Sequence, residues 1–159
     1  MAYNYAYQNF DKKNQARACS VAAQISLKKS VEVAKAICGK SLKQVIVYLE
    51  NVVGEKQVVP YRKYRAEMAH KKGTGVDTGG YPVMVAKEFL RVIKAAEKNA
   101  KEQELGENLV LVSVSARKAQ TRYHYGRHSG RQMKSTTLEV IVGVKKSTGG
   151  KKEWLRGKF

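Results

Sequence analysis

A long stretch between Asn108 and Leu138 has no acidic side chain, and it constrains the fold more than any other feature of this sequence. An alternating apolar run lies at the start of the stretch, at 109–115, and a second apolar run begins near its end, at 136–144. Two such runs are typical of paired β-strands. The basic residues between the runs are Arg117, Lys118, Arg122, Arg127, Arg131 and Lys134. The pattern predicts a β-hairpin whose far part, residues 115–135, is too basic and too poor in aliphatic side chains to form its own core.

The geometry of this hairpin indicates an arm that projects from the body. Aliphatic alternation stops after Ser115, so we expect the core to end there. Strands running over 109–124 and 128–144 would span roughly 50 Å at ~3.3 Å per residue. An isolated two-stranded ribbon is marginal in water, so a polyanion is the expected ordering partner. The residues expected to face the core are Val110, Val112, Val114, Leu138, Val140, Val142 and Val144.

The overall charge supports a polyanionic partner. The chain has 159 residues, of which 43% are hydrophobic, and carries a formal net charge of +18. A length of this order predicts a single domain over residues 1–159 with a real core, and the charge favours nucleic acid over an anionic membrane surface.

The basic residues do not lie opposite a strongly apolar face, which argues against membrane binding. With no leader pattern and no apolar run of membrane-spanning length, we expect a cytoplasmic protein without membrane insertion. Cys19 and Cys38 are expected to be free thiols, although spacing alone leaves a disulfide open.

Helical periodicity dominates the body of the chain. Ser26 is expected to cap a helix that ends at Gly39, and Ser41 a second helix through Val53. Pro82 is expected in the first turn of a third helix, which ends near 105–106. Residues 1–24 show no sustained period, and their alternating tyrosines at 3, 5 and 7 indicate either a short strand or an adhesive arm. The predicted class is α+β: three helices packed on a small antiparallel sheet, with a long projecting β-hairpin.

Two further segments are basic. Residues 54–80 read as a long insertion loop between helices, and residues 146–159 as a flexible basic tail. In the insertion, Tyr61 and Tyr64 lie among cations, a mixture typical of nucleic-acid contact. The cations expected to bind there are Arg62, Lys63, Arg65, His70, Lys71 and Lys72.

The arm carries aromatic as well as cationic candidates. Arg and Lys side chains bind phosphates, whereas aromatic rings stack on unpaired bases. Tyr123, His124, Tyr125 and His128 are the candidates for stacking, beside the six arm cations. Gly126 and Gly130 permit a tight turn and close approach of the backbone.

Catalytic, cofactor and metal sites are not expected. The triplet Gly39-Lys40-Ser41 suggests a phosphate loop, but position 34 is Ala and a helix, not a strand, precedes it. His124 and His128 have no carboxylate or thiol near them in the sequence, which argues against both zinc and acid–base catalysis. We therefore expect a protein that is not an enzyme.

The order of these segments resembles a known family, the universal large-subunit ribosomal protein numbered twenty-two in bacteria and seventeen in eukaryotes. The resemblance spans residues 15–146 and is carried by the segments 26–29, 39–42, 59–64, 80–82 and 99–100, followed by the basic hairpin. The segment 58–82 is similar to an insertion of the archaeal and eukaryotic branch. The tip departs from the family pattern by one extra residue before Gly130, which leaves open the residue that faces a tunnel.

The resemblance implies a structural constituent of the large ribosomal subunit whose arm threads through rRNA and helps line the nascent-peptide exit tunnel. The implied partners are large-subunit rRNA, neighbouring ribosomal proteins and the nascent polypeptide, and a homo-oligomer is not expected. The implied tunnel tip comprises Tyr125, Gly126, Arg127, His128, Ser129, Gly130 and Arg131. A free-standing nucleic-acid-binding protein, of RNA-chaperone or chromatin type, remains the alternative.

Overall fold

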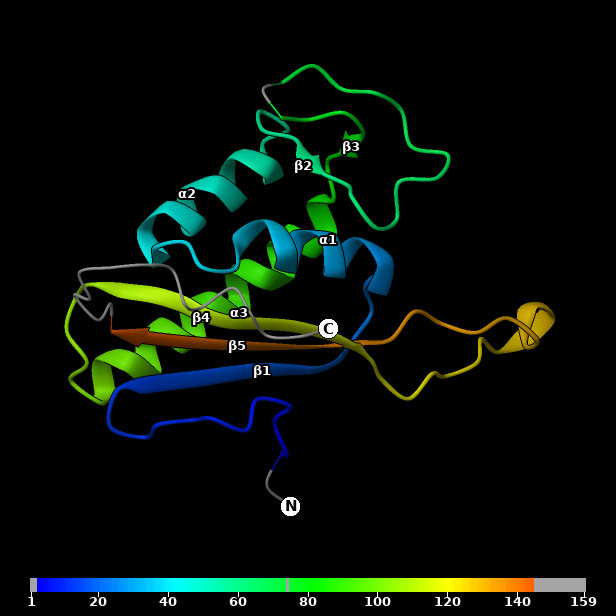
Figure 1. Cartoon of the computed structure of the whole chain (residues 1–159). Helices are drawn as coiled ribbons and strands as arrows, with labels where there is room; N and C mark the ends of the chain where they lie inside the picture. Colours follow the sequence, from blue (N-terminus) through cyan, green and yellow to red (C-terminus); the bar gives the residue numbers. More distant parts are fainter. Residues whose placement is uncertain (1–2, 74, 145–159) are drawn as a thin grey trace.

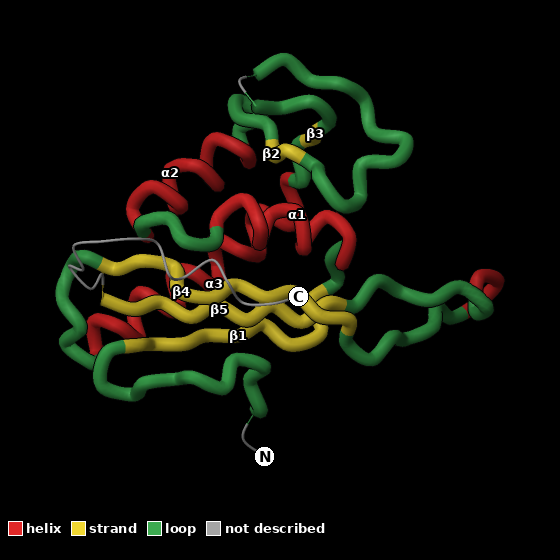
Figure 2. Tube along the Cα trace, viewed as in Figure 1, coloured by secondary structure: helices red, strands yellow, loops and turns green. Residues whose placement is uncertain are grey.

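The computed structural model describes residues 3–73 and 75–144, so the predicted tail at 146–159 lies outside the described residues. Within that part, three helices cover one face of a three-stranded antiparallel sheet, and a two-stranded ribbon lies on the far side of the helices (Figure 1, Figure 2). The predicted α+β class is confirmed. The hairpin extends well beyond the sheet as an arm (Figure 1).

The sheet is built around the second strand of the hairpin. Its order is β1 (Gln15–Ala23), β5 (Thr136–Val144) and β4 (Leu109–Lys118), and both pairings are antiparallel. β1 falls in the segment for which no period was expected. It contacts the core through Ala16 and Ala18, whose small side chains give only a weak alternating signal.

The predicted core face of the first hairpin strand is wrong at its start. Leu109 and Leu111 are buried, whereas Val110 and Val112 are only half-buried. A register shift between Leu111 and Ser113 then reverses the alternation, so that Val114 packs against the core as predicted. An extra residue in one strand moves the following side chains to the opposite face of the sheet. A prediction from simple alternation is therefore wrong on one side of that residue.

The three predicted helices are confirmed. α1 covers Leu27–Ile37, α2 covers Leu42–Val53 and α3 covers Val83–Glu102, with Ser26, Ser41 and Pro82 at their N-caps. Gly39 has φ +78°, the left-handed conformation expected of a residue that ends a helix. α3 packs on β1 and β5, whereas α1 packs on β4. The largest fully buried side chains include Phe89, Ile37, Leu49, Ile93, Leu111 and Leu138.

The insertion is more ordered than a loop. β2 (Val59–Pro60) pairs with β3 (Gly79–Gly80), and Thr78 Oγ1 donates a hydrogen bond of 3.0 Å to the Tyr61 carbonyl. Tyr61, expected among the nucleic-acid contacts, is 5% exposed and belongs to the core. The ribbon therefore fixes both ends of the basic segment to the body.

The N-terminal segment covers the other face of the sheet. Residues 3–10 run beside β1 (Figure 1) as an extended chain outside the regular strands. Tyr3, Tyr5 and Tyr7 are half-buried, and the residues between them are exposed. Because helices cover one face and this segment lies on the other, β5 is buried from Thr136 to Gly143.

Candidate nucleic-acid interface

The arm keeps a paired backbone after the regular strands end. Beyond Lys118 and Thr136, the Ala119 N–H donates to the Ser135 carbonyl over 3.2 Å. Further out, the Met133 N–H donates to Arg122 over 2.7 Å, and the His124 N–H to Arg131 over 2.9 Å. These bonds hold two extended chains side by side out to the tip (Figure 2).

The tip closes with a single turn of 3₁₀ helix at Gly126–His128. The Ser129 N–H donates to the Gly126 carbonyl, and the Arg131 N–H donates to the His128 carbonyl. Gly126 has φ +72°, a conformation that L side chains rarely adopt, so a turn of this shape requires glycine there. The tight turning expected of this glycine from the sequence is present.

Side chains of the arm are directed to solvent. Every residue from 122 to 132 is exposed, and Tyr123 and Tyr125 are 60% and 90% exposed. Five predicted cations of the arm have no ion pair or side-chain hydrogen bond to any described residue: Lys118, Arg122, Arg127, Arg131 and Lys134. Their charges are therefore available to an external anion.

Arg117 differs from the other predicted ligands of the arm. Its guanidinium forms an ion pair with Glu139 and donates a hydrogen bond of 3.2 Å to Tyr3 Oη. The hydrogen bond to Glu139 raises the pKa of Arg117 above its usual range. The side chain is 48% exposed, so this cation belongs to the root of the arm and is shared with the body.

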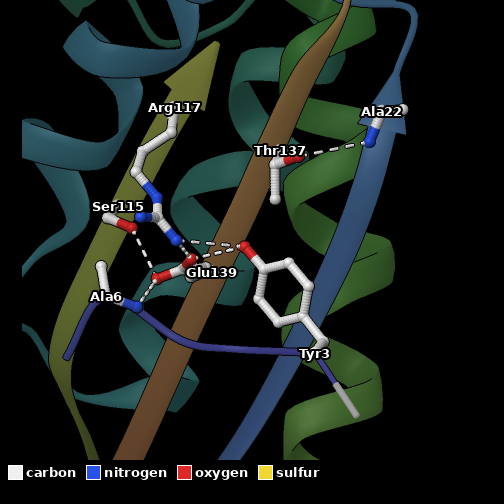
Figure 3. Close-up of polar contacts among 7 residues, drawn as sticks. All are labelled: Tyr3, Ala6, Ala22, Ser115, Arg117, Thr137 and Glu139. Carbon is white, nitrogen blue, oxygen red and sulfur yellow. Dashed lines mark hydrogen bonds and ion pairs between the residues drawn. The ribbon is translucent and has the colours of Figure 1, made fainter. Parts of the chain in front are cut away.

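Glu139 is the acceptor at the centre of this root (Figure 3). The Tyr3 phenol donates to its carboxylate over 2.5 Å, and the Ala6 N–H and Ser115 Oγ each donate over 3.1 Å. Burial alone would raise the pKa of Glu139, but these donors and Arg117 together lower it. The result is a charged carboxylate, 3% exposed, that joins the N-terminal segment to both strands of the hairpin.

A second buried carboxylate holds the insertion. Glu32 in α1 is 1% exposed and accepts the backbone N–H groups of Arg62, Lys63 and Tyr64, over 3.0, 2.8 and 2.7 Å. The chain after β2 is thereby wrapped around the carboxylate. The backbone faces inward at this corner, and the side chains of Arg62 and Lys63 are exposed.

The remaining cations predicted in the insertion are also exposed. Arg65 and Lys72 have no ion pair within the described chain, whereas His70 Nδ1 lies 2.9 Å from Asp77 and Lys71 Nζ lies 5.7 Å from the centroid of the Tyr81 ring. The structure thus brings the insertion cations onto one ordered segment. It leaves the arm cations on a separate projection.

Sequence reasoning missed the two carboxylates that shape these surfaces. Glu32 lies between Val31 and Val33 in α1, and Glu139 lies between Leu138 and Val140 in the central strand. A single acid inside an apolar run is the signal that could have identified each of them, because such an acid is buried only with partners. Among residues 3–73 and 75–144, no cluster of three potential metal ligands occurs, and no helix is long and apolar enough to cross a membrane.

Comparison with known proteins places the chain among ribosomal proteins. The family model described as Ribosomal protein L22p/L17e matches residues 18–143. The large ribosomal subunit protein uL22 of Archaeoglobus fulgidus is 34% identical, over 89% of this chain and 96% of its own length. The uL22 proteins of Ignicoccus hospitalis and Thermoplasma volcanium are 38% and 36% identical, over 76% and 82% of this chain and 82% and 90% of their own lengths.

Proposed function

This chain belongs to the ribosomal protein L22p/L17e family of the large ribosomal subunit, and we propose that it binds large-subunit rRNA through its insertion and its arm. We further propose that the arm helps line the nascent-peptide exit tunnel. The family identifies a ribosomal protein and not an enzyme, which disfavours the alternative of a free-standing nucleic-acid-binding protein.

The observation that carries the proposal is the unpaired positive charge of the arm. Residues 122–132 are all exposed and contain no acidic side chain, so their cations repel one another in the free protein. Neutralising phosphates remove this repulsion and release counterions, which supplies the affinity. A ribbon with no core of its own gains its order from the walls of the RNA passage that it occupies.

The tip is proposed to reach the tunnel. From Lys118 to Tyr125 an extended chain spans roughly 23 Å at ~3.3 Å per residue, enough to carry the turn away from the body. Tyr123, His124 and Tyr125 are exposed and suited to stacking on unpaired bases. Residues 125–131 then form the surface offered to the nascent polypeptide.

The insertion is proposed to anchor the body. Its exposed cations are the predicted phosphate ligands, and Glu32 holds the corner that presents two of them. The protein would act as one copy per subunit and as one domain, in which the insertion and the arm are extensions of a common core. Neighbouring ribosomal proteins are the expected further partners.

A triple substitution tests the arm. In Arg122→Ala/Arg127→Ala/Arg131→Ala, the loss of three phosphate ligands should make the plot of log affinity against log salt for large-subunit RNA less steep by about 2 to 3. Incorporation into large subunits should fall in parallel. The matched control is Lys87→Ala/Lys94→Ala/Lys98→Ala, which removes equal charge from exposed positions on α3.

RNA binding by the arm and its role at the tunnel wall can be tested separately. Unchanged salt dependence and unchanged incorporation in the arm variant would contradict RNA binding by the arm. If incorporation is normal but the tunnel of the reconstituted subunit, imaged at side-chain resolution, shows no arm at its wall, the tunnel role is wrong.

A further inference from the structure

Arg17 lies on the outer face of β1 against two aromatic rings. Its guanidinium carbon is 4.4 Å from the centroid of the Tyr5 ring and 4.6 Å from that of Phe10. In the sheet it pairs with Ile141, which is 1% exposed and lies on the face opposite the helices. The N-terminal segment therefore holds this cation on the sheet surface.

The N–H donors of Arg17 remain unused. Attraction of a cation to the faces of aromatic rings requires no hydrogen-bond acceptor. The Arg17 side chain forms no hydrogen bond or ion pair with any described residue. A half-buried guanidinium with free in-plane donors is suited to a bidentate acceptor such as a phosphate or a carboxylate.

The surroundings provide further donors. Arg17 borders an open hollow of about 480 Å³, which Lys12, Asn99 and Gln103 also line. Lys12 is exposed and has no partner in the described chain, and Asn99 Nδ2 donates to the Arg17 carbonyl over 2.9 Å. Glu102 is the acid of the lining, and it forms no ion pair with Arg17 or Lys12.

The Tyr5 ring is connected to the root of the arm. The Tyr5 ring contacts Tyr3 edge-to-face, with centroids 5.0 Å apart, and Tyr3 donates its hydroxyl to Glu139. The contact with Tyr5 therefore limits the positions that Arg17 can adopt before any ligand binds. A preorganised fork loses less conformational entropy on binding than a free surface arginine does.

We propose that Arg17, held by Tyr5 and Phe10 and assisted by Lys12, is a third phosphate-binding site for large-subunit RNA, distinct from the arm and the insertion. The inference rests on the proposed function. Two cations with no carboxylate partner fit a phosphodiester chain passing over the hollow better than the single carboxylate of a protein side chain. The net charge of +18 favours the same choice.

Substitutions of Arg17 with the full chain and deproteinised large-subunit RNA test the site. Arg17→Gln retains a planar group against the rings without the charge, and it should lower affinity about tenfold. Its slope of log affinity against log salt should become less steep by about 0.7 to 0.9. Arg17→Lys retains the charge without the fork, so its slope should stay that of the wild type while its affinity falls severalfold.

Two further variants separate positioning from charge. Tyr5→Leu leaves the charge in place but loosens it, and it should weaken binding without changing the slope. Lys94→Ala removes one exposed charge from α3, outside the hollow, and should leave both quantities unchanged. Thermal unfolding of each free variant verifies that the fold is retained.

The outcomes distinguish this site from the function on which it rests. If Arg17→Gln matches Lys94→Ala while the arm triple variant lowers the slope, the Arg17 site is overturned and RNA binding stands. If wild-type protein shows no salt-dependent RNA binding, the proposed function itself fails. If Arg17→Gln retains the RNA slope but loses contact with a neighbouring ribosomal protein in reconstituted subunits, the ligand is a protein carboxylate and the proposal is wrong.

Discussion

Tyr3 donates a hydrogen bond of 2.5 Å to Glu139, and this contact joins the N-terminal segment to the central strand of the sheet. Burial raises the pKa of Tyr3, and its bond to Glu139 raises it further. Tyr3→Phe retains the ring but removes the hydrogen bond to Glu139. The substitution should loosen the N-terminal segment and lower the free energy of unfolding by about 1 kcal/mol. Faster hydrogen exchange at the Ala6 N–H measures this loosening, and unchanged exchange would contradict it.

Acid should weaken the same contact. The pKa of Glu139 in the folded chain lies below its ordinary value of 4.5, so its charged form contributes stability fully above that value. That contribution is lost as pH falls through the lower, folded pKa. The difference in unfolding free energy between the wild type and Glu139→Gln, measured by thermal unfolding from pH 7 to pH 2, should shrink on acidification. A difference independent of pH would show that folding leaves the pKa of Glu139 unchanged.

Glu32 should be a positioning residue for the insertion. Glu32→Ala leaves three backbone N–H groups without their acceptor, which should cost about 2–3 kcal/mol and accelerate amide exchange at 62–64. Affinity for large-subunit RNA should fall although Glu32 carries the wrong charge to bind it. Glu50→Ala removes an exposed acid from α2 and is the matched control. Stronger RNA binding by both variants alike would mean that only net charge matters.

The corrected strand face can be tested by paired truncations. Leu111→Ala should destabilise the protein by about 2–5 kcal/mol because Leu111 is fully buried. Val110→Ala, at a half-buried neighbour, should cost less than about 1 kcal/mol. Chemical denaturation of both variants measures the difference. Equal losses of stability in the two variants would contradict the burial of Leu111 in preference to Val110.

The two glycines of the tip should behave differently. Gly126→Ala places a methyl group on a residue with φ +72° and should strain the turn by about 1–2 kcal/mol. Gly130→Ala meets no atom within 4 Å and should be neutral in the free protein. Amide chemical shifts of 122–132 report the turn. Equal perturbation by both variants would argue against the 3₁₀ geometry.

Periodicity predicted what depends on local order. The three helices, the caps at Ser26 and Ser41, and the hairpin follow from spacing and from glycine and proline positions. β1 was missed because alanines bury little area and leave a faint pattern. The face of β4 was mistaken because an irregular register reverses alternation without leaving any mark on residue type.

The candidate surfaces show the same division. Exposure of the arm and insertion cations follows from the absence of apolar neighbours. The partner of Arg117 could not be predicted, because Glu139 and Tyr3 meet it only through sheet pairing and through the path of a segment more than a hundred residues away. Tyr61 was assigned to nucleic acid because it lies among cations, yet the two-residue ribbon turns its ring into the core.

The order β1-β5-β4 has a consequence for the course of folding. β1 and β4 are each paired with β5, so the three-stranded sheet cannot form until β5 has been synthesised. Helices α1 to α3 precede that point and can collapse together first, whereas the sheet must wait and close a long loop. If the arm binds RNA as proposed, early binding of the arm would bring β4 and β5 together. The nucleic acid would then assist folding of the sheet as well as being the binding partner of the folded protein.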